Sequence, residues 1–310
     1  MKYYVLYNPY SSNNRGQYVS EQLKELMPDK EFCFFDVTKI ENIKLFLKEL
    51  NTDDKLVICG GDGTLNRFVN SIEGVKLKND IYLYAGGSGN DFLNDLGRKS
   101  ENFPICINQY IKNLPRVSFN GQTMRFINGI GFGIDGYVCQ EGDRIRMKSH
   151  KPVNYTGIAL KGLLFKYKPV NAQVTIDGKS YAFSKVWLAP TMKGRFFGGG
   201  MMIAPSQDRM NAENTVSVII ASNLNKLNIL RLFPKIFKGN HIKYTKYVKV
   251  FEGNNITVEF DRPNAMQIDG ETFLNVISYS VTTDEKPTAI QSIKNEVKTK
   301  IKSVKDKITQ

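Results

Sequence analysis

The sequence predicts two domains: a doubly wound α/β domain, followed by an antiparallel β domain with the strand pattern of a sandwich or barrel. Over roughly the first 110 residues, apolar strand-like runs alternate with helix-like segments, as in a parallel sheet covered by helices. From about residue 115, strand-like runs follow one another and are joined by Asn-Gly, Asp-Gly and Gly-Asn turns. The length of 310 residues is comfortable for two domains.

The first domain is predicted to contain four strands separated by three helices. The third strand is apolar throughout, which is typical of a strand buried on both faces of a sheet. The helices are indicated by apolar residues at spacings of three and four. The expected strands are residues 3–9, 32–38, 55–61 and 81–87, and the expected helices are residues 20–28, 41–50 and 64–72.

The second domain is predicted to consist mainly of strands, with helical segments near residues 154–167 and 225–238. The strand-like runs are rich in β-branched and aromatic residues. They cover residues 117–135, 172–190, 215–222, 247–260 and 273–281. We therefore divide the chain into an α/β domain (1–122), a β-sandwich domain (123–286) and a C-terminal helix (287–310).

The C-terminal segment 287–310 predicts a basic amphipathic helix. A narrow apolar stripe of isoleucine and valine repeats at spacings of three and four, and lysines surround it. Two interpretations are open: a helix that lies on anionic lipid, or one that packs back on the first domain with its lysines in solvent.

The amino-acid composition disfavours several kinds of functional site. Four cysteines without a C-x-x-C pair and only two histidines disfavour a zinc site, a disulfide framework and a Ser–His–Asp triad. No apolar run approaches the roughly 18–20 residues that span a bilayer, and no signal peptide is visible, so we expect a cytoplasmic protein. The formal net charge of +13 indicates a phosphate-bearing partner, such as nucleic acid, anionic lipid or nucleotide, unless it serves solubility alone.

The stretch CGGDGTLNRFVN, residues 59–70, predicts a phosphate site where the third strand meets the third helix. Its glycines are expected to adopt positive φ and to present backbone N–H groups at the positive end of the helix. A carboxylate among phosphates requires a cation, so Asp62 indicates a Mg²⁺-bound nucleotide. The plainer alternative is a tight turn in which Asp62 caps the helix. The expected phosphate-binding residues are Gly60, Gly61, Gly63 and Thr64, the last of which could instead cap the helix.

A second motif, AGGSGNDFLNDLG (residues 85–97), repeats this arrangement after the next strand. It carries Ser88, Asn90 and Asp91 behind its glycines. Because the carboxyl ends of parallel strands meet at one edge of a sheet, we expect the two motifs to face the same crevice.

A third motif, MQIDGE (residues 266–271), contains Asp269 and Glu271. Taken alone, this motif favours a plain hairpin turn, because Asp-Gly is a favoured type I′ turn pair. The Walker A string is absent from the sequence, and a Rossmann phosphate loop starting at Gly61 is excluded because its third glycine would fall at Asn66.

Together and in this order, these motifs resemble the diacylglycerol kinase catalytic family, which includes bacterial lipid kinases and sphingosine kinases. The nearest pattern is that of the soluble bacterial diacylglycerol kinases, and the first motif is shared with NAD kinases and, loosely, with 6-phosphofructokinases. In chain order the resemblance rests on Asn8-Pro9 with Ser11-Ser12, GGDGTLNRFVN, GSGNDF, INGIGFGIDG (127–136), FFGGGMMIAP (196–205), FKGNHIK (237–243) and IDGE.

The resemblance implies a nucleotide-binding α/β domain and a β-sandwich domain that binds lipid, with the active site between them. Asp62 and Asp91 would orient the metal and phosphates, and Glu271 would accept the proton of the lipid hydroxyl. Asp269, from the same motif as Glu271, is counted with the catalytic residues. ATP with Mg²⁺ would lie against Asn8, Ser11, Ser12, Thr38, Gly60, Gly61, Gly63, Thr64, Ser88 and Asn90. The acyl chains would contact Phe196, Phe197, Met201 and Met202, unless these belong to an ordinary β core.

Three positions depart from the family pattern. Arg67 stands where the family usually has Glu, and Asn94 stands where it has Arg. An Asp-Asp-Gly turn that binds a structural magnesium in the family is replaced by residues 210–212, Met-Asn-Ala. The expected metal ligands are therefore Asp62 at the nucleotide and, at the altered turn, Asp208, Asn211 and Glu213.

We expect an ATP- and Mg²⁺-dependent lipid kinase that phosphorylates diacylglycerol or a related lipid alcohol, giving phosphatidic acid or the equivalent lipid phosphate. Its expected partners are the lipid substrate and the anionic inner face of the membrane, with peripheral association. Soluble bacterial relatives suggest a homodimer, and no nucleic-acid-binding signature is present. Two alternatives stay open: an NAD kinase-like enzyme, based on the shared GGDGT, and a lipid- or nucleotide-binding protein that has lost catalysis, based on Arg67 and Asn211.

Overall fold

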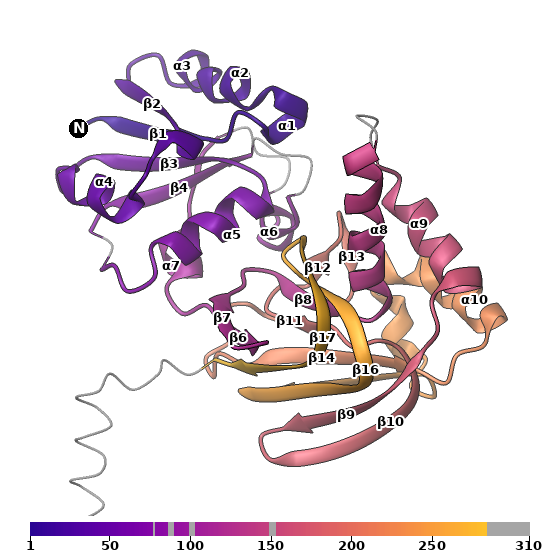
Figure 1. Cartoon of the computed structure of the whole chain (residues 1–310). Helices are drawn as coiled ribbons and strands as arrows, with labels where there is room; N and C mark the ends of the chain where they lie inside the picture. Colours follow the sequence, from indigo (N-terminus) through magenta and orange to yellow (C-terminus); the bar gives the residue numbers. More distant parts are fainter. Residues whose placement is uncertain (77, 86–89, 99–102, 149–152, 284–310) are drawn as a thin grey trace, which may run out of the picture.

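A computed structural model describes residues 1–76, 78–85, 90–98, 103–148 and 153–283 of the chain. The predicted C-terminal helix, residues 287–310, and Ser88 lie outside the described residues. Figure 1 shows a smaller α/β part and a larger β-rich part that meet near the helices α5 and α6. Among the described residues, no helix is both long and apolar enough to cross a membrane.

The first part is a five-stranded sheet with the strand order β2-β1-β3-β4-β5. The first four strands are parallel, and the short β5 runs antiparallel to β4. The strands are β1 (Tyr3–Tyr7), β2 (Phe32–Asp36), β3 (Lys55–Gly60), β4 (Asp80–Ala85) and β5 (Ile105–Cys106). The helices are α1 (Ser11–Asn14), α2 (Gly16–Glu21), α3 (Leu23–Leu26), η1 (Val37–Lys39), α4 (Ile43–Glu49), α5 (Asp62–Ser71), α6 (Asp91–Asp95) and α7 (Asn108–Ile111).

Helices cover both faces of this sheet, which confirms the predicted doubly wound α/β fold. One apolar cluster joins the sheet to α4, α5 and α7, and includes Leu65 and Ile111. A second cluster joins the opposite face to α2 and α3 through Leu23. The helix expected over residues 20–28 begins earlier, at Gly16, and is interrupted at Gln22. Gly16 is needed there because a Cβ atom would collide with the carbonyl oxygen of Asn8.

The second part is built on a ten-stranded antiparallel sheet with the order β7-β6-β17-β16-β8-β11-β14-β10-β9, in which β15 also pairs with β14. The long strand β16 pairs with both β8 and β9, so the sheet curls back on itself around one apolar core. Its strands are β6 (Arg116–Phe119), β7 (Gln122–Arg125), β8 (Gly129–Phe132), β9 (Val170–Ile176), β10 (Lys179–Leu188), β11 (Thr191–Met192), β14 (Val216–Ser222), β15 (Val248–Gly253), β16 (Asn255–Ile268) and β17 (Glu271–Thr282). A separate hairpin consists of β12 (Phe196–Phe197) and β13 (Met201–Met202). The predicted antiparallel β domain is confirmed.

The chain enters the second sheet at Arg116, before residue 122, where we placed the end of the first domain. The β6–β7 hairpin then lies against α5. The side chain of Asn70 both accepts from the backbone N–H of Arg125 (2.7 Å) and donates to its carbonyl (3.0 Å). Glu73 pairs with Arg116 at 3.1 Å. These contacts fix the first part against the second.

Helix α8 (Ile134–Lys148) is the main element that the sequence did not predict, and the strand expected over residues 117–135 ends before it. Its turns are largely polar, so apolar periodicity does not reveal it. Gly133, at φ +114°, ends the strand that precedes it. The two predicted helical segments are present, as α9 (Tyr155–Lys161) with η2 (Gly162–Lys166) and as α10 (Lys226–Ile236). The short η3 (Asn240–Lys243) follows α10 and was not predicted. Figure 1 shows α8, α9 and α10 as one group beside the second sheet.

Candidate functional site

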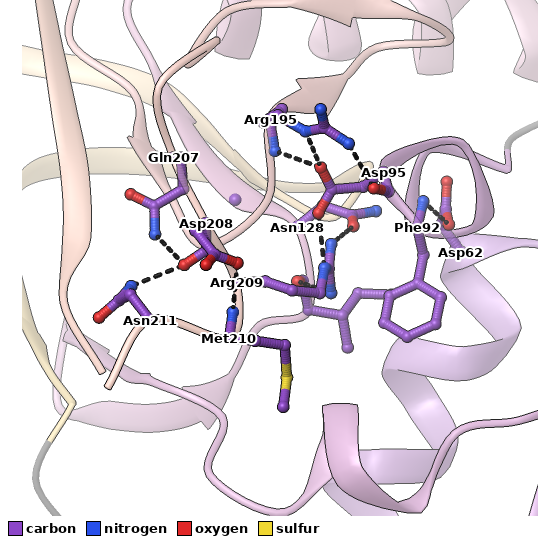
Figure 2. Close-up of polar contacts among 12 residues, drawn as sticks. Asp62, Phe92, Asp95, Asn128, Arg195, Gln207, Asp208, Arg209, Met210 and Asn211 are labelled. Carbon is purple, nitrogen blue, oxygen red and sulfur yellow. Dashed lines mark hydrogen bonds and ion pairs between the residues drawn. The ribbon is translucent and has the colours of Figure 1, made fainter. Parts of the chain in front are cut away.

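Asp62 connects the first two glycine motifs directly. It is the first residue of α5, and its carboxylate accepts hydrogen bonds from the backbone N–H groups of Asp91 (2.7 Å) and Phe92 (3.1 Å) in α6. Figure 2 shows the contact with Phe92. Asp62 therefore caps α6, whereas the residue at the N-cap position of its own helix is Gly61. The plainer alternative, in which Asp62 or Thr64 caps α5, is not what the structure contains.

Asp62 is buried near two other predicted acids. Burial, followed by the charge of Asp91, raises the pKa of Asp62 to about 7, although its two N–H donors oppose this shift. The charge of Asp269 also contributes to the raised pKa. Three of the predicted acids thus interact, and a cation bound beside them would be stabilised by their combined charge.

Asp91 joins the first sheet to the second part of the chain. Its side chain is buried, and its Oδ2 accepts a hydrogen bond of 2.7 Å from the backbone N–H of Gly199, in the turn of the β12–β13 hairpin. Asn90, predicted to bind nucleotide, occupies the N-cap position of α6. In the same hairpin, Phe196 and Phe197 are buried and Met201 and Met202 are half-buried.

Asp269 is a hydrogen-bond hub between the two parts. It accepts from the backbone N–H groups of Ile127 (2.6 Å), Asn128 (2.9 Å) and Gly129 (3.0 Å), and from the side-chain amide of Asn66 in α5 (2.7 Å). Burial raises the pKa of Asp269, while these four donors lower it. Since its oxygens are occupied in this way, Asp269 serves to position the turn that carries it.

The third motif is both a hairpin turn and part of the site. Asp269 (φ +47°) and Gly270 (φ +92°) form the two-residue turn between the paired residues Ile268 and Glu271. Glu271 begins β17 and is exposed. Because Asp269 fastens this turn to α5, the Glu271 backbone is held at the boundary between the two parts, where Figure 1 shows the start of β17 near α6.

A cavity of about 310 Å³ lies beside α5 in the first part. It is lined by three predicted nucleotide-binding residues, Asn8, Thr38 and Thr64, and by the unusual Arg67. Its remaining wall is largely apolar, which suits a flat heterocyclic base. Ser11 and Ser12 do not line this cavity. The Ser11 hydroxyl instead donates to the carbonyl of Asn8 (2.7 Å), and so supports the loop after β1.

The glycines of the first motif have steric roles, and the positive φ angles that we expected are wrong. Gly61 has φ −99°, and neither Gly60 nor Gly63 has positive φ. A Cβ atom on Gly60 would lie 2.5 Å from the Thr64 hydroxyl, whereas one on Gly63 would meet nothing within 4 Å. Gly63 thus leaves open space at the N-terminus of α5, where first-turn N–H groups lack helical acceptors.

This difference gives a matched pair of variants. Gly63→Ala should keep or slightly raise the melting temperature, because alanine favours a helix over glycine by about 0.5–1 kcal/mol. It should nevertheless weaken nucleotide binding, since the methyl group enters the space beside the free N–H groups. Gly60→Ala should lower the melting temperature by its clash with Thr64. Thermal melting and nucleotide titration separate the two effects; unchanged nucleotide affinity in Gly63→Ala would contradict this assignment.

Asp95 anchors an ion network that sequence reasoning missed (Figure 2). Its carboxylate accepts from Arg209 (2.6 Å) and from Arg195 (2.7 Å). The buried Arg209 also donates to the carbonyl of Ile127 and to the side chain of Asn128, and its guanidinium lies 4.4 Å from the ring centroid of Phe92. Asp95 belongs to α6 and both arginines to the second part, so this network holds the two parts together. Two separated arginines gave no recognisable sequence pattern.

In the turn expected to bind a structural metal, side-chain amides form hydrogen bonds with the backbone carbonyls. The Asn211 amide donates to the carbonyls of Asp208 (2.6 Å) and Thr215 (3.1 Å), and its oxygen accepts from the Thr215 N–H (2.8 Å). Gln207 donates to the same two carbonyls. The carbonyl oxygens that could ligate a cation are therefore already paired, and Glu213 contributes only its backbone carbonyl, to Asn254. These residues do not fit a divalent metal, and within the described residues no cluster of three His, Cys, Asp or Glu offers one a site.

We expect the stability of the protein without nucleotide to be independent of magnesium at this turn. The wild-type melting temperature should be the same in excess MgCl₂ and in excess EDTA. Asn211→Asp replaces the donating amide with a carboxylate, so its melting temperature should fall in EDTA and recover in MgCl₂. A magnesium-dependent melting temperature in the wild-type protein that Asn211→Ala abolishes would contradict the expectation.

Asp135, in the first turn of α8, is another residue that the sequence did not single out. Burial raises its pKa from the ordinary 3.8 to about 7. Among the described residues, neither of its carboxyl oxygens makes a hydrogen bond of ordinary geometry, although the nearby backbone N–H groups of Asp135 and Gly136 oppose the rise in pKa. Gly131 leaves room for Asp135 and Gln267, because a Cβ atom there would collide with both side chains. Gln267 in turn accepts from the Gly270 N–H (2.8 Å), so Asp135 lies behind the Asp269 turn.

This raised pKa predicts the pH dependence of stability. The folded protein binds a proton that the unfolded chain has released, so the free energy of unfolding should fall as pH rises from about 4 to about 7. Asp135→Asn should remove part of this slope and stabilise the protein by about 1–3 kcal/mol at pH 8, with a smaller gain at pH 5. Asp62 contributes a slope of the same sign, so urea unfolding of the variant is compared with the wild type at each pH. An equal gain at both pH values would exclude Asp135 as the cause.

Two family models match the chain. The diacylglycerol kinase catalytic domain matches residues 2–119, and the YegS C-terminal NAD kinase beta sandwich-like domain matches residues 128–293. The second match alone covers more than half of the chain.

Named relatives and a solved structure agree with these models. A diacylglycerol kinase of Mycobacterium tuberculosis is 26% identical over 61% of this chain, and the match spans 62% of that relative's length. A candidate lipid kinase of Bacillus subtilis, YtlR, is 24% identical over 94% of this chain and 99% of its own length. The crystal structure of a diacylglycerol kinase from Bacillus anthracis superposes with a TM-score of 0.61 and 16% identity, covering 91% of this chain and 94% of that one. This last likeness supports the fold.

Proposed function

Because the chain belongs to the diacylglycerol kinase catalytic-domain family, we propose that it is an ATP-dependent lipid kinase. It transfers the γ-phosphoryl group to the hydroxyl of diacylglycerol or a related lipid alcohol, giving phosphatidic acid or the equivalent lipid phosphate. The observation that carries the proposal is the joining of Asp62, Asp91 and Asp269, from separate motifs and both parts of the chain. A cavity in the α/β part is lined by Thr64, from the same helix as Asp62.

The nucleotide occupies the cavity between the strand ends and α5. Its base lies against the apolar wall, and its phosphates reach the N-terminus of α5, where Gly63 leaves open space. Arg67 lines the same cavity and adds a positive charge near the phosphates. This charge complements the nucleotide, so the departure from the family's usual Glu is compatible with an active enzyme.

Asp62 and Asp91 fit a Mg²⁺ ion carried by the nucleotide. Burial, followed by the charge of Asp91, raises the pKa of Asp62, and a cation held beside Asp62 would favour its ionised form. When bound, Mg²⁺ would neutralise phosphate charge and align the phosphates for transfer. Asp62 also holds α6 in place through two N–H groups, and this geometry keeps Asp91 and the β12–β13 turn at the site.

Glu271 acts as the general base. It is exposed at the start of β17, and Asp269 fixes the turn that carries it by four hydrogen bonds. Its carboxylate accepts the proton of the lipid hydroxyl as the oxygen attacks the γ-phosphorus, and the bond to the ADP oxygen breaks. The half-buried Met201 and Met202 beside the Asp91 contact offer apolar surface for the acyl chains.

The proposal is tested with γ-labelled ATP, Mg²⁺ and a total lipid extract, followed by mass spectrometry of labelled products. We expect label in a lipid phosphate, with diacylglycerol as a good acceptor. A parallel reaction contains NAD as the only acceptor. Label in NAD alone would replace the lipid kinase by an NAD kinase. Nucleotide binding without labelled product in a single turnover would indicate a protein that has lost catalysis.

A further inference from the structure

Helix α10 exposes apolar side chains on the face opposite the one that it buries. Ile229 and Leu232 are buried against the β-rich part, yet Leu227 and Leu230 are exposed, as is Phe237 directly after the helix. The exposed residues follow at spacings of three and seven, so they share one outer side of the helix. A helix that is apolar on both sides is typical of one that is covered on both sides.

A neighbouring segment continues this exposed surface. Phe165 of η2 is 74% exposed, and Leu160 of α9 is also exposed. The ammonium group of Lys226, at the start of α10, lies 5.5 Å from the ring centroid of Phe165. Underneath, Leu163 of η2 and Ile229 of α10 belong to one buried cluster. The exposed apolar side chains of these neighbouring elements are here called the helical apolar face, on the group of helices in Figure 1: Leu160, Phe165, Leu227, Leu230 and Phe237.

The charged residues in the segments that carry the helical apolar face have one sign. The sequence has no Asp or Glu between Asp143 and Asp177, and none between Glu213 and Glu252. Both exposed segments lie inside these two stretches. The exposed basic residues around the face are Lys161, Lys166, Lys226, Arg231 and Lys238. Apolar side chains on segments whose only charges are cationic match the interface of an anionic bilayer, where the apolar groups enter the acyl boundary and the cations meet the headgroups.

We propose that the helical apolar face docks on an anionic lipid bilayer. A second copy of the chain would bring the same cations against each other, and residues 284–310 are themselves rich in lysine, so charge favours the bilayer over either occupant. The purpose of docking rests on the proposed function, since a kinase for a membrane-embedded alcohol must reach its substrate at the bilayer. Binding itself requires no turnover.

The test is flotation of the full chain with vesicles, in the absence of nucleotide. We expect binding to vesicles of equal phosphatidylglycerol and phosphatidylcholine, weaker binding to phosphatidylcholine alone, and a loss of affinity as salt increases. The double variant Phe165→Ser with Leu227→Ser should bind at least about tenfold more weakly, since burying one large apolar side chain is worth about tenfold in affinity. The matched control is Phe103→Ser with Leu45→Ser, which changes the same residue types at exposed positions of the first part and should bind as the wild type does.

The outcomes separate docking from catalysis. Equal binding by the double variant and the wild type, or no binding of the wild type to either vesicle, overturns the docking proposal. So does a change of molar mass in light scattering on substitution of Phe165 and Leu227, because that would identify the face as an interface between copies. Circular dichroism melting confirms that both variants are folded. Vesicle binding by a protein that labels no lipid would support docking and defeat the proposed kinase function.

Discussion

Glu271→Gln should lower kcat for lipid phosphorylation by about 10²–10⁴-fold, the usual contribution of a positioned general base. Glutamine has nearly the same size but cannot accept the hydroxyl proton. Asp269 holds the turn through four hydrogen bonds and does not depend on the Glu271 side chain. The melting temperature and the affinity for ATP should therefore stay at their wild-type values, so that the loss appears in kcat.

A control on the same hairpin is Glu259→Gln. Glu259 is exposed in β16, pairs with Ser278 and lies far along the strands from the turn. It should leave both kcat and stability unchanged. A Glu271→Gln enzyme with wild-type kcat would remove Glu271 from the chemistry and assign the motif to the hairpin alone.

The sequence predicted the fold well because its signals were local. Alternating strand and helix patterns predicted the doubly wound sheet. Strand-like runs joined by Gly-containing turns predicted the antiparallel strands. Helix α8 was not predicted because its largely polar turns show little apolar periodicity. The sequence around Gly133 also did not indicate that the preceding strand ends there. The closure of the second sheet through β16 depends on pairing between distant strands, which short patterns do not encode.

The sequence predicted which acidic residues come together at the site, but it predicted the roles of the individual residues less well. Asp62, Asp91 and Asp269 do interact, but each carboxylate also acts as a structural acceptor of backbone N–H groups. The glycines were expected to supply positive φ, yet at Gly60 and Gly63 what matters is the space around the missing Cβ atom. Such roles depend on which backbone groups lie next to each side chain in the folded protein. Tertiary packing determines this, and short sequence patterns do not encode it.

The contact between Asp95 and Arg209 is expected to make the largest contribution of any ion pair to stability. Each side chain is only 4% exposed, and the two belong to different parts of the chain. Asp95→Asn leaves the Arg209 guanidinium buried without a countercharge, and breaking a buried pair in this way costs about 3–5 kcal/mol. Urea unfolding should show this loss in the midpoint. It should also show a second transition, because the network joins the two parts.

Two controls separate this effect from a general loss of charge. Arg195→Ala removes the 36% exposed partner but leaves Asp95 paired with Arg209, so it should cost about 1 kcal/mol or less. Asp143→Asn breaks an exposed pair with Arg146 within α8 and should cost even less. If Asp95→Asn costs no more than Asp143→Asn, then the pair contributes little, and the hydrogen bonds of Asp269 and Asp91 must hold the two parts together instead. In that case we would expect Asp269→Asn to cause the larger loss of stability, because it removes a carboxylate that accepts four hydrogen bonds.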